Sequence, residues 1–260
     1  MRRLALLVVV LVTACGGSSS APAAKPTTVL PSGTGPAPVV VLVPGGSWTA
    51  ADPRGLEPLA KALARGGAVA TTTTYRTGAD GRFPAPVEDV LCAAAEAVAQ
   101  AKAEGRGGGP LVLVGHSAGG PLAVLAALRP QAFRGDCPAP PVTPDAVVGL
   151  AGAYDLDQLG DVPLALLGAP RSQAQDLWHQ ADVFVWANER PALPVLLVHG
   201  TGDRTVPPTM TTRLRDALVH YGHPVRLEQP NGVDHDGVYR AEVAAPLILD
   251  WLARDVPHTG

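Results

Sequence analysis

The chain has 260 residues, of which 47% are hydrophobic and 17% are charged, and its formal net charge is −3. A chain of this length and apolar content can bury a core of its own, so one globular domain is expected. The charge balance argues against a nucleic-acid surface, which needs clustered basic residues, and the aromatic fraction of 4% argues against a stacking platform for bases.

The first 14 residues have the pattern of a signal peptide. Arg2 and Arg3 precede an apolar run over residues 4–12, which is shorter than the roughly 20 apolar residues that span a bilayer. The sequence Val-Thr-Ala-Cys that ends at Cys15 resembles the lipobox of bacterial lipoproteins, in which the cysteine is lipidated. We therefore expect an exported protein, anchored through Cys15 to the outer face of a bacterial membrane. The alternative is an ordinary secretory signal in which Cys15 has no role.

The segment that follows is poor in large apolar side chains. Residues 15–37 consist mainly of Gly, Ser, Ala, Pro and Thr, and such a composition predicts a flexible tether. Residues 38–260 would then form the folded domain.

In this domain, apolar segments typical of buried strands alternate with helical patterns. The predicted strands cover residues 39–43, 68–75, 111–115, 146–152, 194–200 and 225–229. The predicted helices cover residues 56–67, 86–104, 118–128, 208–221 and 238–253. Strands that are apolar throughout and are followed by helices predict an α/β fold, with a mostly parallel sheet covered on both faces.

A Gly-His-Ser-Ala-Gly sequence directly follows the predicted strand at residues 111–115 and opens the next helix. This is the setting of a nucleophile elbow, in which a tight turn exposes the serine hydroxyl at the end of a strand. The glycines, Gly115 and Gly119, let neighbouring backbone approach the turn closely. Ser117 is therefore the candidate nucleophile, and the N–H of Ala118 is a candidate donor to an oxyanion.

A serine nucleophile needs a base that a third group orients, and in this fold the chain order is serine, acid, histidine. Asp203 follows the predicted strand at 194–200, and His235 follows the one at 225–229. Both lie in loops at the carboxyl ends of strands, where parallel sheets place their sites. We predict Ser117, His235 and Asp203 as a catalytic triad.

Other residues compete for these roles less well. His116 is expected to point away from the serine on the tight turn, and His199 to pack or hydrogen-bond at the end of its strand. Asp182 precedes the strand that should carry the acid. The remaining candidates are His220, His223, His258, Asp234 and Asp236.

These motifs together resemble the α/β-hydrolase fold and, within it, small bacterial carboxylesterases related to the hormone-sensitive-lipase family, over residues 38–252. Those enzymes carry His-Gly-Gly-x-Trp, Tyr-Arg, Gly-His-Ser-Ala-Gly-Gly and Gly-x-x-Asp-x-x-Val-Pro motifs. The matching residues here are Gly45, Gly46, Trp48, Tyr75, Arg76, Gly200, Asp203, Val206 and Pro207. The resemblance implies that the N–H groups of Gly46 and Ser47 complete the oxyanion hole. The chain departs from the pattern at Pro44, which replaces the histidine that anchors this loop.

The resemblance implies a serine hydrolase that cleaves small carboxylic esters. The segment at residues 154–190 is too short for a lid of domain size, which favours short acyl groups. An amide hydrolase, such as an aryl-formamidase or a peptidase, and a non-catalytic binding lipoprotein on the same fold remain as alternatives. No Cys/His spacing resembles a zinc site, and the serine mechanism implies no metal or organic cofactor. The oligomeric state is not predicted.

Two cysteines remain after the signal segment, Cys92 and Cys137. In an exported protein an even pair favours a disulfide. The other interpretation is two unpaired buried thiols.

Overall fold

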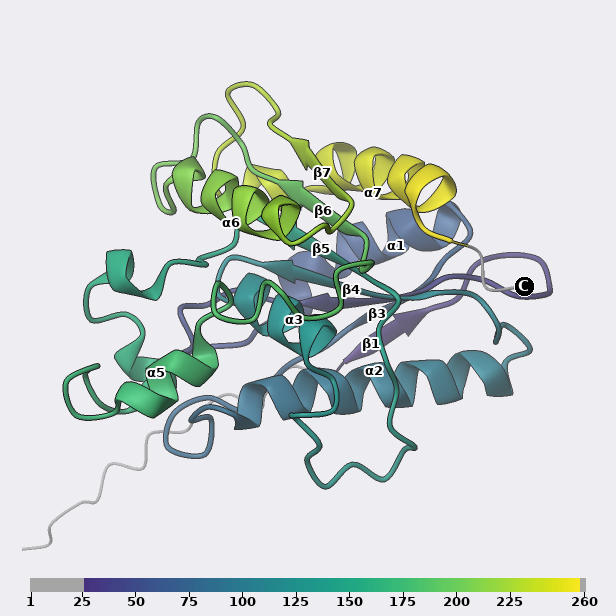
Figure 1. Ribbon diagram of the computed structural model, residues 1–260. Coiled ribbons are helices and arrows are strands. Elements are labelled where there is room, and N and C mark those ends of the chain that lie inside the picture. Colours follow the sequence, from purple (N-terminus) through teal and green to yellow (C-terminus); the bar gives the residue numbers. More distant parts are fainter. Residues whose placement is uncertain (1–25, 258–260) are drawn as a thin grey trace, which may run out of the picture.

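The computed structural model describes residues 26–257, and a single twisted sheet runs through the middle of this part of the chain (Figure 1). Its strands are β1 (Thr27–Val29), β2 (Val39–Val43), β3 (Val69–Thr72), β4 (Leu111–His116), β5 (Ala146–Leu150), β6 (Val195–Val198) and β7 (Val225–Glu228). Their order across the sheet is β1-β3-β2-β4-β5-β6-β7. Only β1 runs antiparallel to its neighbour; every other pair is parallel.

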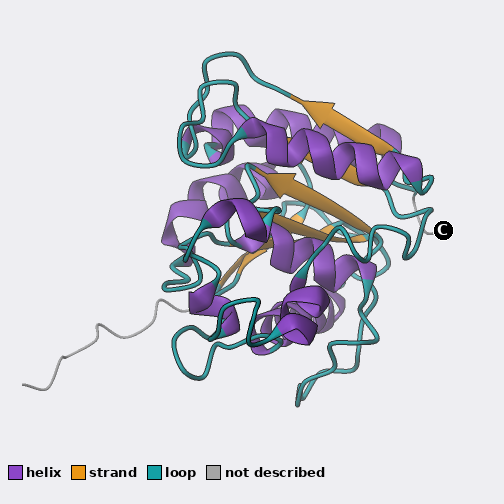
Figure 2. Cartoon of the chain, turned by 60° about the vertical axis from the view of Figure 1, so that its left-hand side comes forward, coloured by secondary structure: helices purple, strands orange, loops and turns teal. Residues whose placement is uncertain are grey.

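Helices cover both faces of this sheet (Figure 2). They are α1 (Glu57–Arg65), α2 (Ala85–Ala103), α3 (Gly119–Leu128), α4 (Leu164–Leu167), α5 (Gln175–Ala181), α6 (Pro208–His220) and α7 (Ala241–Asp255). The helices α1 and α7 pack on one face, and α2, α3 and α6 on the other. Successive residues of a strand point to opposite faces, so Val112 packs with one set and Leu113 with the other. This two-sided burial explains why the central strands are apolar throughout.

The predicted α/β-hydrolase architecture is confirmed. Each predicted strand and helix is present, with bounds that differ by a few residues. The last predicted helix begins with a 3₁₀ turn, Gly237–Tyr239, before α7. The segment between β5 and β6 holds a 3₁₀ turn, Leu156–Leu159, and the short helices α4 and α5, which form a small cap on the α3 side of the sheet (Figure 1).

The predicted tether is wrong for its carboxyl-terminal part. Residues 27–29 form β1, which pairs with β3 from Thr27 opposite Thr72 to Val29 opposite Ala70. The guanidinium of Arg106 donates hydrogen bonds to the carbonyls of Pro31 and Gly35. Because these contacts satisfy the backbone of a segment that has few apolar side chains, residues 27–37 belong to the domain despite their composition.

The predicted signal peptide, Cys15 and the rest of the predicted tether up to residue 25 lie outside the described residues. Within residues 26–257, no helix combines the length and the apolar character that crossing a membrane requires.

Candidate active site

Ser117 occupies a strained turn between β4 and α3. Its φ is +50°, in the left-handed region that residues with a side chain rarely adopt. A Cβ on Gly115 would lie 2.2 Å from the Gly119 carbonyl oxygen, and one on Gly119 would lie 2.5 Å from the carbonyl oxygens of Val43 and Pro44. Only glycine therefore fits at positions 115 and 119, two residues before and two residues after the serine. The turn aims the positive end of the α3 dipole at the space beside the Ser117 hydroxyl.

The structure brings the three predicted triad side chains together. The Ser117 hydroxyl donates to Nε2 of His235 across 2.9 Å, and Nδ1 of His235 donates to Oδ2 of Asp203 across 2.7 Å. The three residues come from the loops after β4, β6 and β7, whose carboxyl ends lie at one edge of the parallel sheet. The geometry is that of a nucleophile, a general base and an acid that holds the imidazole tautomer.

The Asp203 carboxylate is buried but well supplied with donors. Its Oδ1 accepts hydrogen bonds from the N–H groups of Thr205 and Val206, at 2.8 and 2.9 Å. Burial alone would raise the pKa of Asp203, but the bonds from Val206, His235 and Thr205 outweigh it, and the pKa is lowered. Asp203 is therefore ionised at neutral pH and stabilises a positive charge on His235.

His199 contacts the Asp203 carboxylate rather than Ser117. Its Nε2 lies 3.0 Å from the Val206 carbonyl and 3.1 Å from Oδ2 of Asp203, while Nδ1 lies 2.6 Å from the Thr211 hydroxyl. Burial lowers the pKa of His199, so its ring is neutral and donates through Nε2. The predicted packing and hydrogen-bonding role of this histidine agrees with these contacts.

His116 points toward His235 rather than toward Ser117, and it still lies within the site. Its Nε2 donates to the backbone carbonyl of His235 across 3.1 Å, and its ring centroid lies 4.9 Å from that of His235 and 4.5 Å from that of Tyr239. Burial, followed by repulsion from His235, lowers the pKa of His116 to about 4. The His116 ring is therefore neutral at pH 7, and it packs beneath the loop that carries His235.

The oxyanion loop after β2 has an unusual backbone. Gly46, Ser47 and Trp48 all have positive φ, at 128°, 52° and 58°. In the turns and loops of residues 26–257, the N–H groups of Gly46, Ser47 and Ala118 have no carbonyl acceptor. Their role as oxyanion donors stays a prediction, and these N–H groups have no backbone acceptor that would compete with it.

Two long-range hydrogen bonds hold this loop in place. The Trp48 indole donates to the Ala118 carbonyl across 3.0 Å, and the Tyr75 hydroxyl donates to the Pro44 carbonyl across 3.2 Å. Both aromatic side chains are buried. They provide the anchor that the resemblance assigns to a histidine at position 44, and sequence reasoning missed both contacts.

A hollow of about 300 Å³ opens beside the triad. Its lining is rich in polar groups, including Asp52, Thr205, Asp236 and Tyr239. Ser47, Ser117, His116 and His235 lie in the same lining. The hollow therefore holds the candidate nucleophile, its base and part of the oxyanion loop in one space.

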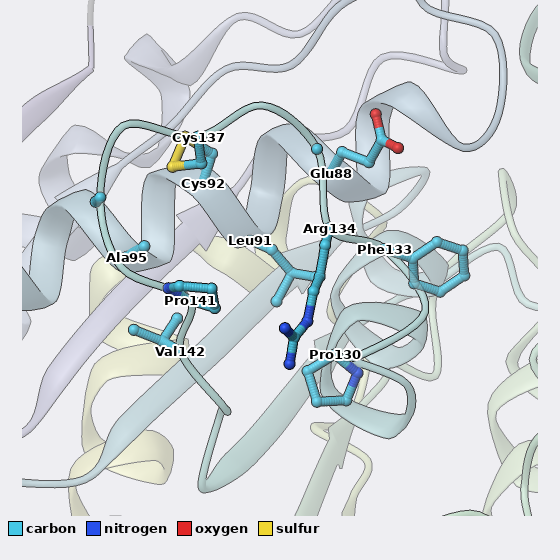
Figure 3. Close-up of a pocket in the computed structure, with 12 residues that line it drawn as sticks. Glu88, Leu91, Cys92, Ala95, Pro130, Phe133, Arg134, Cys137, Pro141 and Val142 are labelled. Carbon is cyan, nitrogen blue, oxygen red and sulfur yellow. A yellow bond between two sulfur atoms is a disulfide. The ribbon is translucent and has the colours of Figure 1, made fainter.

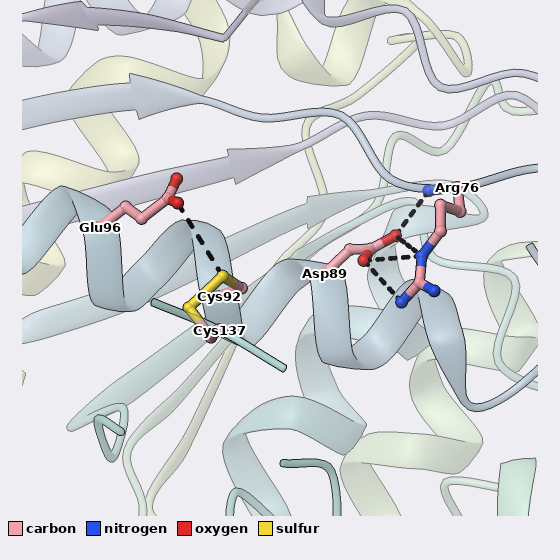
Figure 4. Close-up of a disulfide and its surroundings, with 5 residues drawn as sticks. All are labelled: Arg76, Asp89, Cys92, Glu96 and Cys137. Carbon is pink, nitrogen blue, oxygen red and sulfur yellow. Dashed lines mark hydrogen bonds and ion pairs between the residues drawn. A yellow bond between two sulfur atoms is a disulfide. The ribbon is translucent and has the colours of Figure 1, made fainter. Parts of the chain in front are cut away.

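The structure joins Cys92 of α2 to Cys137 in a disulfide, with the Cα atoms 5.4 Å apart (Figure 4). Near it, an ion pair between Arg76 and Asp89 ties the loop after β3 to α2. The chain around Cys137 passes over α2 and encloses a smaller hollow of about 60 Å³, with Leu91 in its lining (Figure 3). This hollow shares no lining residue with the one beside the triad.

Comparisons with known proteins place the chain in a family. The BD-FAE family model matches residues 29–218. The probable carboxylic ester hydrolase LipM of Mycobacterium tuberculosis is 31% identical over 186 residues, which cover 67% of this chain and 43% of LipM. The chain thus spans less than half the length of this relative.

Solved structures share the fold. A truncated carbohydrate esterase from the gut microbiota aligns with a TM-score of 0.75 at 18% identity, covering 87% of this chain and 88% of that one. Esterase 2 of Thermogutta terrifontis, solved with propionate bound, aligns with a TM-score of 0.67 at 21% identity, covering 88% of each chain. Because the family model spans most of the sequence, the chain belongs to the BD-FAE family of α/β-hydrolase esterases.

Proposed function

We propose that this protein is a serine hydrolase that cleaves carboxylic esters of small or short-chain acyl groups through an acyl-enzyme. The observation that carries the proposal is the unbroken hydrogen-bonded series from the Ser117 hydroxyl through the His235 imidazole to the Asp203 carboxylate. A serine without such a base is a poor nucleophile at neutral pH.

The proposed reaction has two halves. Ser117 attacks the ester carbonyl carbon while Nε2 of His235 takes its proton, and Asp203 stabilises the resulting imidazolium. The N–H groups of Ala118, Gly46 and Ser47 bind the oxyanion of the tetrahedral intermediate. His235 then protonates the leaving alcohol. Water, deprotonated by His235, attacks the acyl-enzyme and releases the acid and the free serine.

Two features favour a small substrate. The cap between β5 and β6 has no helix longer than the seven residues of α5, so it offers no extended wall for a long acyl chain. The structurally similar Thermogutta esterase was solved with propionate and with butyrate. The polar lining of the 300 Å³ hollow suits an alcohol that carries hydroxyl groups of its own, and one structural relative is a carbohydrate esterase.

The test is ester turnover by the Ser117→Ala variant. With p-nitrophenyl acetate, its kcat should fall by at least about a thousandfold, because the acyl-enzyme cannot form. Ser172→Ala, at an exposed position of the cap, is the matched control and should keep the wild-type rate. Equal rates in wild type and Ser117→Ala would refute the triad assignment.

Two further measurements separate the alternatives. A fluorophosphonate probe should label wild type but not Ser117→Ala, whereas a binding protein on a hydrolase fold would resist labelling. Faster turnover of formyl-amides or peptides than of acetyl esters would assign the site to amide hydrolysis instead.

We also propose that the protein is exported and anchored to the membrane by a lipid on Cys15. The sequence at residues 2–15 supports this, and so does the Cys92–Cys137 disulfide, because disulfides persist in oxidising compartments. In a bacterial host, the full chain should incorporate an alkyne-labelled fatty acid and sediment with membranes. Cys15→Ala should lose the label, and an unlabelled wild-type chain would contradict the proposal.

A further inference from the structure

The hollow beside the triad also contains a group of three potential metal ligands: His116, His235 and Asp236. One ligand atom from each of these side chains lies within 4.8 Å of the other two. All three residues line the same hollow. His116 ends β4, whereas His235 and Asp236 lie in the loop after β7, so the sheet topology and not sequence spacing assembles the group.

Both imidazoles already have the hydrogen bonds typical of metal ligands. A histidine that binds a metal almost always donates its other ring N–H to a carboxylate or a backbone carbonyl, which fixes the tautomer. Nδ1 of His235 donates to the Asp203 carboxylate, and Nε2 of His116 donates to the carbonyl of His235. The lone pairs that would bind a cation are therefore those on Nδ1 of His116 and on Nε2 of His235, where the cation would displace the hydrogen bond from the Ser117 hydroxyl.

The third group is the Asp236 carboxylate, which has no hydrogen-bond or salt-bridge partner among the described residues. Asp236 is exposed, and within residues 26–257 it forms no salt bridge and caps no helix with its side chain. Asp234, on the other side of His235, differs, because its Oδ1 accepts a hydrogen bond from the N–H of Gly237. Of the two acids that flank His235, Asp236 is the one whose carboxylate lies within reach of both imidazoles.

We propose that His116, His235 and Asp236 bind Zn²⁺ reversibly and that this zinc inhibits the enzyme. Two nitrogens and one carboxylate oxygen, with a fourth position open to the hollow, form a donor set that suits zinc, whereas Mg²⁺ and Ca²⁺ take oxygen ligands. Zinc on Nε2 of His235 occupies the lone pair that accepts the Ser117 proton. The inhibition rests on the proposed ester hydrolysis, but the binding does not.

Calorimetry tests the binding without reference to catalysis. Untagged full-length Ser117→Ala protein, freed of metal with a chelator, is titrated with zinc chloride. We expect one zinc per chain, and no comparable heat with magnesium chloride. In the same background, Asp236→Asn should raise the Kd by about tenfold or more through loss of a ligand, and His116→Asn should do the same.

Matched controls separate this site from adventitious surface binding. Asp80→Asn removes an exposed acid far from the hollow in sequence, and His220→Asn removes an exposed histidine on α6; both should leave the Kd unchanged. Asp236 is exposed, so its variant remains informative even where the buried His116 variant fails to fold. No binding at one equivalent, or equal Kd values for Asp236→Asn and Asp80→Asn, would overturn the proposed site.

Inhibition is measured on the wild-type chain with p-nitrophenyl acetate. Zinc should abolish turnover at saturation, a chelator should restore it, and the zinc concentration for half inhibition should rise at least tenfold in Asp236→Asn, each variant being compared with its own metal-free rate. Zinc binding with undiminished turnover would refute the inhibition. Zinc binding by a chain that hydrolyses no ester would refute the proposed function and leave the site intact.

Discussion

Removing the Cys92–Cys137 disulfide should lower the free energy of unfolding by about 4 kcal/mol. The two cysteines are 45 residues apart in sequence. In the chain-entropy treatment, closing a loop of that length removes about 13 cal/mol/K from the unfolded chain, which is about 4 kcal/mol at 25 °C. This is a large part of the roughly 5–15 kcal/mol by which a domain is stable.

The closed loop contains Ser117 and His116, but the disulfide itself lies apart from the hollow that these two residues line. It begins in α2, passes through β4, Ser117 and α3, and ends at Cys137. None of the residues around the disulfide lines the hollow that holds Ser117 and His235. The variant should therefore unfold more readily while its folded form keeps the wild-type kcat/KM at 25 °C.

The assay is urea unfolding followed by far-ultraviolet circular dichroism, with wild type compared with the Cys92→Ala, Cys137→Ala double variant. Alanine avoids placing a hydroxyl at two half-buried positions. Dithiothreitol should shift wild type towards the double variant and leave the double variant itself unchanged. A loss below about 1 kcal/mol in both comparisons would refute the loop-entropy reasoning, and a loss of kcat/KM in folded protein would refute the independence of the two hollows.

Three further results are expected. Asp203→Asn should lower kcat with p-nitrophenyl acetate about 10⁴-fold, since a neutral amide cannot stabilise the imidazolium; a loss below tenfold would contradict the acid assignment. Trp48→Phe should destabilise the fold by about 1–3 kcal/mol in urea, because the buried Ala118 carbonyl loses its donor, and should lower kcat more than it raises KM; an unchanged kcat would show that the loop needs no such anchor. The free energy of unfolding should fall as the pH drops from 6.5 towards 4. Over this interval His116 is protonated in the unfolded chain, where its pKa is about 6.5, but stays neutral in the folded chain, where its pKa is about 4. In His116→Gln the loss of unfolding free energy between pH 6.5 and 4 should be smaller by up to about 3 kcal/mol. In the exposed control His220→Gln the loss should equal that of wild type.

The candidate triad could be predicted from the sequence because, in a parallel sheet, the loop after each strand emerges at the same edge. The loops after β4, β6 and β7 all leave the sheet at the carboxyl ends of their strands, so residues that are 32 and 118 positions apart meet at one edge. Apolar runs indicated the strands. The loops that follow three of these strands contain a serine, an aspartate and a histidine, which identified Ser117, Asp203 and His235 as candidates.

The elements that sequence analysis missed gave weak local signals. β1 is a three-residue edge strand inside a stretch of small and polar residues, and its order comes from pairing with β3 and from the Arg106 side chain, neither of which leaves a local pattern.

The orientation of His116 was predictable in principle. Val112 and Val114 pack on the α7 face of the sheet, and strict alternation along β4 assigns His116 to the same face, beneath the loop that carries His235.

Pro44 replaces the histidine of the family motif, yet the loop after β2 still has the fixed backbone that an oxyanion loop needs. An oxyanion loop needs a fixed backbone with N–H groups free for the intermediate, and any side chain that restrains its carbonyls can supply the restraint. Here the Tyr75 hydroxyl binds the carbonyl of Pro44, and the Trp48 indole binds that of Ala118, so the loop after β2 and the turn that holds Ser117 are fixed to one another. A histidine at position 44 would add a further restraint to a loop that these two aromatic side chains already hold. The motif residue could therefore be lost without loss of the donors, provided that both aromatic anchors stay in place.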